Sequence, residues 1–467
     1  MRFITSVVLI FFAILSLQAF DKISCRIDFS IKGLENNQII FAFEYGNKDI
    51  VLDTIRLDSE GKGAYTNKHR LTGGIYIILL PSQKYFEVLV NDEQFFTVNT
   101  DTTDYIGNLV IEGSDESEQF RQYVQLSLDY EKSLKRAKKT GHSKDSIQHS
   151  QLPKGTGVTD KKKKEIELFT ANILNTYPKS FLAAYLRMKQ DVELPEQYIV
   201  NSKGASREYF KNRYQFIKSH YFDNVDFTDI RLLRTRLLYE KLEYFFNIFI
   251  AQDADSLSEE MDFVITKAKV NEESYKYVLN FLITNYRQPK NQNQEKALVY
   301  LADNYYLFGK APWADPRFLK ILQERVDALR PSLLGVKAAN LELQKINGDL
   351  ISLYNQKSDY LILYFWSPDC NICKTETPKL YDIYTKYKNK NVRVIAIYTH
   401  ADKVIWQNEL ADKGYDWLNV YDPLLKSNFS KLYNVDVTPK IYILDKDKRI
   451  VAKGNNTQTI AKFFRDK

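Results

Sequence analysis

Residues 361–373, LILYFWSPDCNIC, decide the fold of the last third of this 467-residue chain. The first six of them form an uninterrupted apolar and aromatic run of strand length. Turn-forming residues follow at 367–369, directly before Cys370. Beyond the second cysteine, apolar side chains return at helical spacing, as Leu380, Ile383, Tyr384 and Tyr387. The sequence therefore predicts a buried strand that ends in a turn and places Cys370 at the start of a helix.

This position predicts redox chemistry at the two cysteines. A helix N-terminus carries free N–H groups and partial positive charge, which favour a thiolate, so Cys370 is the expected nucleophile. Cys373 lies one turn further along and can attack a mixed disulfide to release the product. Zinc ribbons also use such pairs, but they need a second pair of ligands, and the third cysteine, Cys25, and the five scattered histidines supply none. Neither a metal nor a cofactor is indicated.

The pattern after this helix predicts further alternation of strands and helices. We expect strands at 391–398, 440–444 and 449–453, and helices at 403–413, 424–433 and 457–464. With the first strand and helix, this order predicts an α/β domain over residues 334–467.

Several features of this region resemble the thioredoxin family, namely the run Tyr364–Trp366, Pro378 and the pair Thr438-Pro439 before a strand. By that resemblance the domain has a thioredoxin-like fold, and Pro439 should be a cis proline that faces the two cysteines. The backbone of Thr438 would then pair with an extended substrate peptide as an added strand. Trp366 is interpreted first as core packing and second as a floor under the active site.

The narrower resemblance is to the TlpA/ResA branch of exported thioredoxins. Glu376, three residues after Cys373, matches the glutamate that these proteins carry beside their two cysteines. Their lead-in also appears, with Gly335, residues 338–343 and the Asn347-Gly348 turn. The upstream part of the chain is similar in order and composition to the accessory domains of some exported TlpA-like proteins.

Two residues depart from the thioredoxin pattern. Tyr364 occupies the position where thioredoxins usually keep a buried acid, so the usual proton acceptor for Cys373 is missing. Glu376 is the substitute candidate for that role, against the alternative of a solvated helix carboxylate. Asp369 precedes Cys370 in place of an aromatic residue, and its negative charge should disfavour the thiolate.

Two further domains are predicted upstream. Residues 20–113 show short strands separated by turn residues, including two strand-like runs on either side of Asn91-Asp92, where we expect a hairpin. They predict a small all-β sandwich. At Asp115 the period becomes helical, with Asp115 as the expected N-cap and Glu118 completing a capping box. Residues 114–333 are therefore predicted to be all-α, and the whole chain to be multidomain.

Charge and targeting signals limit the partners. Lys+Arg total 66 against Asp+Glu 59, and this net charge of +7 is not concentrated in an arm or tail, so nucleic acid is not an indicated partner. Arg2 and the apolar run at 7–17 predict a cleavable signal peptide over residues 1–19, and hence a protein of the periplasm or cell envelope. Asp21 and Lys22 argue against lipoprotein anchoring at Cys25.

The sequence favours a thiol-disulfide oxidoreductase that reduces protein disulfides, since no histidine lies between Cys370 and Cys373 as in strong oxidants. Its partners would be protein thiols and disulfides and a membrane or periplasmic electron donor, and a homodimer stays open. One alternative is a thiol-dependent peroxidase, suggested by Ser367, although Leu363 stands where that class has a proline. Another is a binding or assembly protein that works through its N-terminal domains.

Overall fold

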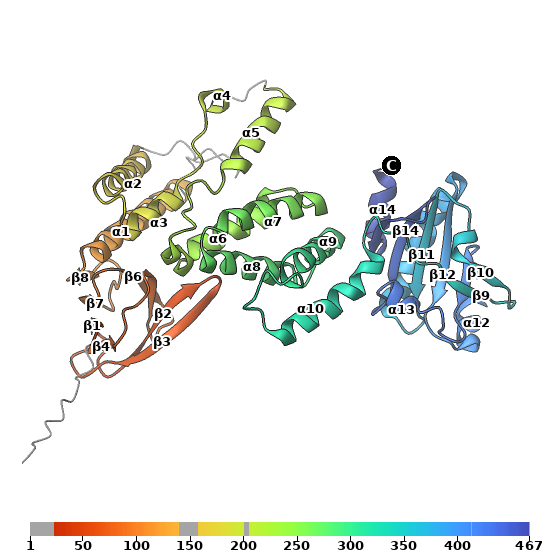
Figure 1. The fold of residues 1–467 in the computed structure, drawn as a ribbon, viewed down its shortest axis with the longest axis horizontal. Helices are drawn as coiled ribbons and strands as arrows, with labels where there is room; N and C mark the ends of the chain where they lie inside the picture. Colours follow the sequence, from red (N-terminus) through yellow and green to blue (C-terminus); the bar gives the residue numbers. More distant parts are fainter. Residues whose placement is uncertain (1–22, 140–156, 200–204, 412, 467) are drawn as a thin grey trace, which may run out of the picture. The chain divides into compact units, whose positions relative to one another are not determined.

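The computed structural model describes residues 23–139, 157–199, 205–411 and 413–466. The chain divides into two compact units, Met1–Lys241 and Leu242–Lys467, and each is described by itself. The predicted signal peptide at 1–19 lies outside the described residues. The predicted order of fold classes is confirmed, with strands first, helices next and an α/β domain last (Figure 1). The exact domain boundaries stay predictions.

Within the described residues, two four-stranded sheets form the N-terminal domain. The first has the order β4-β1-β7-β8, with β1 (Cys25–Lys32), β4 (Lys62–Asn67), β7 (Phe95–Asp101) and β8 (Val110–Glu112). The second has the order β3-β2-β5-β6, with β2 (Gln38–Tyr45), β3 (Lys48–Arg56), β5 (Gly74–Leu79) and β6 (Tyr85–Val90). Side chains of both sheets, such as Phe29 and Phe41, are buried in one core, which makes the domain a sandwich.

The hairpin expected at Asn91-Asp92 is wrong. Strand β6, before these residues, belongs to the second sheet, whereas β7, after them, belongs to the first and pairs with β1 in parallel. The turn residues therefore mark a crossing between sheets. The same turn residues suit a hairpin within one sheet and a crossing between two sheets, because their preferences are local. The crossing is set by the core between the sheets, where Val90 and Phe96 are both buried.

Helix α1 (Asp115–Lys139) begins where expected, but its N-cap is Ser114 and not Asp115. The Ser114 hydroxyl accepts the N–H of Ser117 at 3.3 Å, and the Ser114 carbonyl accepts that of Glu118 at 3.0 Å. Serine and aspartate cap equally well, so composition alone does not separate the two neighbours. The α-helices that follow are α2 (Gly157–Thr176), α3 (Phe181–Lys189), α4 (Glu196–Ile199), α5 (Arg207–His220), α6 (Arg236–Tyr244), α7 (Ala254–Ala268), α8 (Glu272–Tyr286), α9 (Gln292–Leu301) and α10 (Pro316–Leu329).

The C-terminal domain has a seven-stranded sheet, in the order β10-β9-β13-β12-β11-β14-β15, in the described part of the chain. Its strands are β9 (Glu342–Lys345), β10 (Leu350–Ser352), β11 (Tyr360–Trp366), β12 (Val392–Tyr398), β13 (Leu418–Tyr421), β14 (Lys440–Asp445) and β15 (Ile450–Gly454). Strand β11 lies between parallel β12 and antiparallel β14. Ile362 and Tyr364 are buried on one face of the sheet, and Leu363 and Phe365 on the other. Burial on both faces explains why this strand is continuously apolar.

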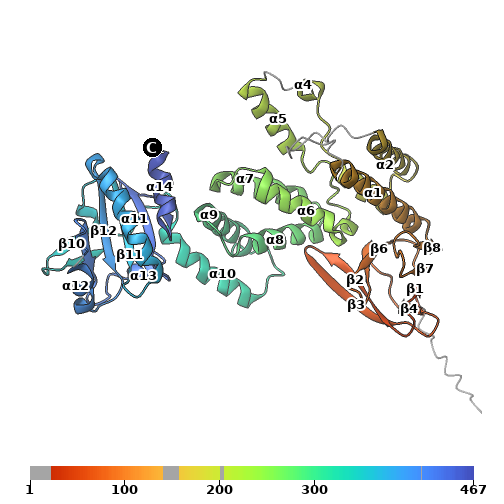
Figure 2. The ribbon, with the colours of Figure 1, turned by 180° about the vertical axis from the view of Figure 1, so that it is seen from behind.

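Helices cover this sheet on its two faces. Helix α11 (Asn371–Tyr387) lies over the face that is turned to the viewer in Figure 2, and α12 (Lys403–Ala411) and α14 (Thr457–Arg465) contribute to the same core. The helix expected at 424–433 is limited to α13 (Phe429–Leu432). Leu425 and Asn428 have φ values of 51° and 58°, in the left-handed region that a right-handed helix excludes. Residues 424–428 are therefore a loop.

A buried ion pair joins strand β15 to helix α9 within the 242–467 unit. Lys453 of β15 and Glu295 of α9 are 4% and 16% exposed, and the Lys453 ammonium also donates to Ser332 O at 2.7 Å. Gln292 Oε1 accepts the backbone N–H of Lys453 at 3.0 Å, which occupies a donor of this edge strand. Burial lowers the pKa of Lys453, and Glu295 opposes that shift.

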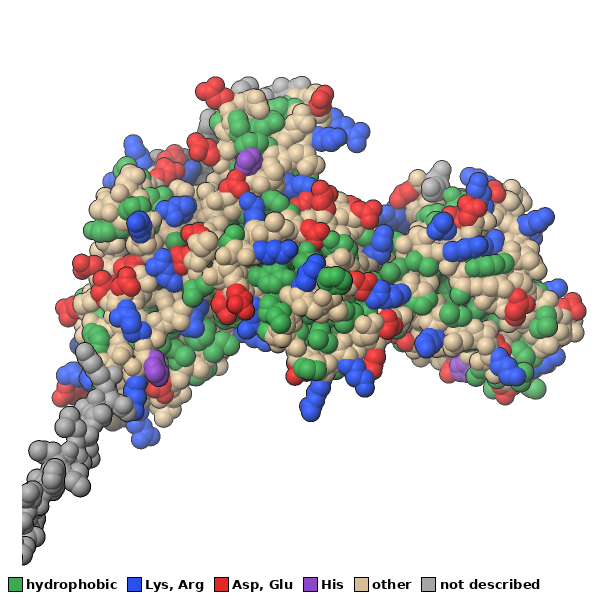
Figure 3. Space-filling view, in the orientation of Figure 1, with side chains coloured by type: hydrophobic (Ala, Val, Ile, Leu, Met, Phe, Trp, Pro, Cys, Tyr) green, Lys and Arg blue, Asp and Glu red, His purple; other side chains and the backbone are tan. Residues whose placement is uncertain are grey.

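The surface carries charged side chains of both signs. On the face drawn in Figure 3, Lys and Arg are interspersed with Asp and Glu and do not gather in one basic patch among the residues drawn in colour. In the described ranges, none of the helices has both the length and the apolar character needed to cross a membrane.

Candidate active site

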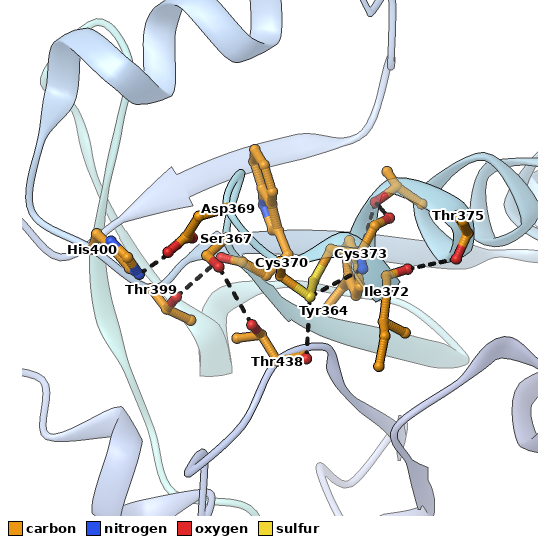
Figure 4. Close-up of a disulfide and its surroundings, with 12 residues drawn as sticks. Tyr364, Ser367, Asp369, Cys370, Ile372, Cys373, Thr375, Thr399, His400 and Thr438 are labelled. Carbon is orange, nitrogen blue, oxygen red and sulfur yellow. Dashed lines mark hydrogen bonds and ion pairs between the residues drawn. A yellow bond between two sulfur atoms is a disulfide. The ribbon is translucent and has the colours of Figure 1, made fainter.

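Cys370 is the N-cap of helix α11, directly after the turn that follows β11. Its Sγ accepts the backbone N–H of Cys373 at 3.0 Å, so the helix N-terminus points at this sulfur. The two cysteines form a disulfide, with their Cα atoms 5.2 Å apart (Figure 4). Cys370 is partly exposed, whereas Cys373 is only 2% exposed. An incoming sulfur can therefore reach Cys370, and Cys373 lies behind it.

The loop before strand β14 brings Thr438 and Pro439 to the same place. The Thr438–Pro439 peptide bond is cis, and Thr438 O lies 3.2 Å from Cys370 Sγ (Figure 4). The Thr438 and Ser367 hydroxyl oxygens are 3.4 Å apart. In the dithiol form this carbonyl is an acceptor for the Cys370 thiol. Cys370, Ser367, Thr438 and Pro439 thus come together at one point of the surface.

Two aromatic residues of β11 lie beneath the cysteines. Trp366 is 9% exposed, belongs to the core under α11, and packs with its ring centroid 5.8 Å from that of Tyr398. The Tyr364 hydroxyl lies 2.6 Å from Thr377 Oγ1, which donates to Cys373 O at 2.7 Å. Burial raises the pKa of Tyr364, so its hydroxyl stays protonated. Tyr364 therefore fills the space of the missing acid without acting as a base.

Glu376 faces helix α14 in this structure. Its carboxylate is buried, with Oε1 bonded to Lys379 Nζ at 2.7 Å and Oε2 accepting both the N–H and the hydroxyl of Thr457 at 2.7 Å. Burial acts to raise the pKa of Glu376, but the hydrogen bonds from Lys379 and Thr457 outweigh it and lower that pKa. These contacts place an ionised carboxylate at the first turn of α14. The predicted role of Glu376 as proton acceptor for Cys373 stays a prediction.

Asp369 is exposed beside Cys370 and faces His400. One Asp369 carboxylate oxygen lies 3.9 Å from His400 Nε2 (Figure 4). A hydrogen bond from Ser367 lowers the pKa of Asp369, so the carboxylate is charged at neutral pH. The expected opposition between this charge and a Cys370 thiolate also stays a prediction.

A groove of about 650 Å³ opens at Cys370. Its walls come from the turn at the cysteines, from residues 399–400 and from the segment 425–438. Three aliphatic side chains in this lining are exposed, with 57% for Ile372, 53% for Leu425 and 54% for Val437. Exposed aliphatic side chains therefore lie around the reactive sulfur together with polar ones such as Asp369 and His400.

The loop that carries Leu425 is fixed by one carboxylate. Asp422 is 5% exposed and accepts the N–H groups of Leu424 and Ser427 at 3.2 Å and 2.6 Å. Sequence analysis missed this loop and assigned it to a helix. The available signal was the turn-forming pairs at 422–423 and 427–428, Asp-Pro and Ser-Asn.

Comparisons with known proteins match the C-terminal domain and one segment upstream of it. The AhpC/TSA family model matches residues 334–453, and a domain of unknown function, DUF5106, matches residues 187–307. A thiol-disulfide oxidoreductase ResA of Bacillus cereus is 31% identical over 132 residues, which are 27% of this chain and 72% of that protein. ResA of Bacillus subtilis (strain 168) is 26% identical over 125 residues, 27% of this chain and 69% of that protein. Among solved structures, a thioredoxin-like protein from Bacteroides caccae ATCC 43185 is 20% identical with a TM-score of 0.45, covering 59% of this chain and 98% of that one.

The family model and the two ResA relatives agree with the resemblance drawn from the sequence and confirm it. The matched residues include strand β11, both cysteines and the loop before β14. The chain belongs to the family of ResA-like thiol-disulfide oxidoreductases, with the site on its thioredoxin-like domain.

Proposed function

We propose that this oxidoreductase is exported and reduces disulfide bonds in other proteins through Cys370 and Cys373. The arrangement of the two sulfurs supports the proposal, because Cys370 is accessible at a helix N-terminus and Cys373 is buried one turn further along. Neither Asn371 nor Ile372 adds a charge that would over-stabilise a Cys370 thiolate, and this favours reduction over oxidation.

The dithiol form acts in two steps. The Cys370 thiolate attacks a substrate disulfide, a Cys370–substrate bond forms, and the other substrate sulfur leaves with its electron pair and takes up a proton. Cys373 then attacks the Cys370 sulfur and releases the second substrate thiol. The substrate has gained two electrons and two protons, and the chain holds the Cys370–Cys373 disulfide. A dithiol electron donor of the membrane or periplasm returns the dithiol form.

The groove at Cys370 supports an extended protein segment as the substrate. Thr438 and Pro439 would offer backbone groups beside the sulfur, with which such a segment pairs as an added strand. The exposed Ile372, Leu425 and Val437 suit apolar side chains next to the substrate cysteine. Trp366 contributes from below as part of the core.

A Cys373→Ser protein is expected to accumulate mixed disulfides with its substrates, because Cys370 can still attack and no resolving thiol follows. The full chain is expressed with its own N-terminus, thiols are blocked by alkylation in acid, and covalent complexes are separated without reductant. Mass spectrometry then identifies the trapped cysteine and its partner.

The matched control is Cys370→Ser, which keeps the buried cysteine and should trap nothing. Complexes that form equally in both variants, or in neither, would contradict the proposal. Trapped partners from the cytoplasm alone would contradict export but not the exchange chemistry.

A further inference from the structure

A second cavity is lined by Cys373 and shares Ser367 with the lining of the groove at Cys370. It has a volume of about 100 Å³, and its lining comes from β11, β12, α11, α12 and the start of β13. Its lining includes the side of Cys373, the aromatic residues Tyr364, Trp366 and Trp417, and the charged residues Lys374, Glu409 and Lys413. A water molecule needs roughly 10–15 Å³ of such space, so the cavity has room for several waters.

One residue of this lining carries a buried donor without a protein partner. The indole N–H of Trp366 is buried and has no hydrogen-bond partner among the described residues. A buried polar group without a protein partner is usually satisfied by ordered water. Polar side chains of Thr377 and Asn419 line the same space and offer further partners.

The cavity bears on the release step, in which Cys373 must lose its proton. Cys373 is 2% exposed, so bulk solvent does not reach its thiol directly. Tyr364 stays protonated, and Glu376 is bonded to Lys379 and Thr457. Among the described residues that line the cavity, Glu409 is the only carboxylate.

Helix α12 holds Glu409 in this position. Trp406, three residues earlier on the same side of the helix, is fully buried with its ring centroid 4.6 Å from Tyr421 and 6.2 Å from Tyr398. This anchor fixes the rotation of α12 and turns the next position, Glu409, toward the cavity.

We propose that Glu409 accepts the proton of Cys373 through water in this cavity, an inference that rests on the exchange chemistry proposed above. The Cys373 thiol gives its proton to water, which passes it to the Glu409 carboxylate. The thiolate attacks the Cys370 sulfur, the Cys370–substrate bond breaks, and the substrate sulfur leaves with the electron pair and is protonated by solvent. Glu409 afterwards returns its proton to solvent.

The charged groups around the path come from three elements. Lys374 of α11 and Lys413, just after α12, line the cavity and stabilise negative charge on Cys373 or Glu409. Tyr364 of β11 and Tyr415 add hydroxyl groups from the sheet side. Glu376 and Lys379 form an ion pair with each other on α11 and are not part of the lining.

The test uses the reduced full chain and glutathione disulfide as the probe. Samples are quenched in acid at intervals, and mass spectrometry follows the glutathione adduct on Cys370 and its loss when Cys373 attacks, over a range of pH. In Glu409→Gln the adduct should decay about tenfold more slowly than in the parent protein below the pH at which the parent rate levels off. The two rates should converge at high pH, where hydroxide removes the proton. Glu409→Asp should recover most of the loss.

Two outcomes would overturn the proposal, and a control and a fourth result complete the test. An unchanged pH profile in Glu409→Gln, or a loss of rate in Glu376→Gln alone, overturns the proposal. Asp382→Asn, an exposed carboxylate on α11 outside the lining, should match the parent protein and controls for net charge. If the parent protein forms neither the adduct nor the Cys370–Cys373 disulfide, the exchange function itself fails, which is a different result.

Discussion

A Glu295→Ala protein is expected to lose about 3 kcal/mol from the free energy of unfolding of the 242–467 unit. Lys453 would keep its charge in a buried place, with Ser332 as its remaining partner. This loss of stability is larger than the net contribution of the ion pair to the parent protein. The Lys453 ammonium would be left buried without water and without a carboxylate partner. Urea denaturation followed by tryptophan fluorescence measures it, since Trp313, Trp366, Trp406 and Trp417 all lie in this unit.

The double variant Glu295→Met with Lys453→Met separates the effect of the lost charge pair from the effect of lost packing. Replacing both charges by apolar groups of similar volume should restore most of the stability, to within about 1 kcal/mol of the parent protein. Glu324→Gln, on the exposed side of α10, is the control and should change the free energy of unfolding by less than about 0.5 kcal/mol. A Glu295→Ala protein as stable as this control would mean that the pair is not desolvated.

In the parent protein the free energy of unfolding of the first unit should depend on pH through Glu87. A Glu87→Gln protein should lack this dependence. Burial on β6 raises the pKa of Glu87 to about 7, with Glu44 and Glu240 adding to the shift and Lys189 and Arg236 opposing it. Because the folded pKa lies above the unfolded value, the folded state binds this proton more tightly. The resulting stability is complete in acid and is lost as the pH rises to about 7. We expect a loss of about 3 kcal/mol in the parent protein and none from this group in the variant.

Pulse proteolysis in urea at a series of pH values measures this, with fragments from the first unit identified by mass spectrometry. The control is Glu112→Gln, an exposed carboxylate on β8, which should keep the pH dependence of the parent protein. If Glu87→Gln and Glu112→Gln give the same curve as the parent protein, Glu87 ionises normally and is in contact with water.

The parts of the fold that sequence predicts well are those with strong local patterns. Strand β11 is apolar throughout because both its faces are buried, and α11 repeats its apolar residues at helical spacing, so both elements and the position of Cys370 follow from periodicity. The loop at 424–428 was missed because its leucines imitate a helix. Their conformation depends on Asp422, a hydrogen-bond partner that no period reveals.

Contacts between segments that are distant in the sequence were the second feature that could not be predicted from it. The crossing at Asn91-Asp92 depends on which sheet receives β7, and the surroundings of Glu376 depend on Thr457, 81 residues further along the chain. Glu409 attracted no notice in the sequence because it belongs to no motif. Its place in the lining of the cavity at Cys373 depends on α12, which Trp406 anchors against β12 and β13.

Strand β11 and the loop at Leu425 should differ in how easily they open. Strand β11 is bonded on both sides, by β12 and β14, and covered on both faces, so its amide protons should exchange with solvent only when the whole domain opens. Leu425 lies in a loop that is held by the hydrogen bonds to Asp422 and not by a sheet on both sides, so it should open locally at a smaller free-energy cost. Cys370 thus follows the strand expected to exchange most slowly, while the proposed substrate rim at Leu425 belongs to a loop expected to exchange faster.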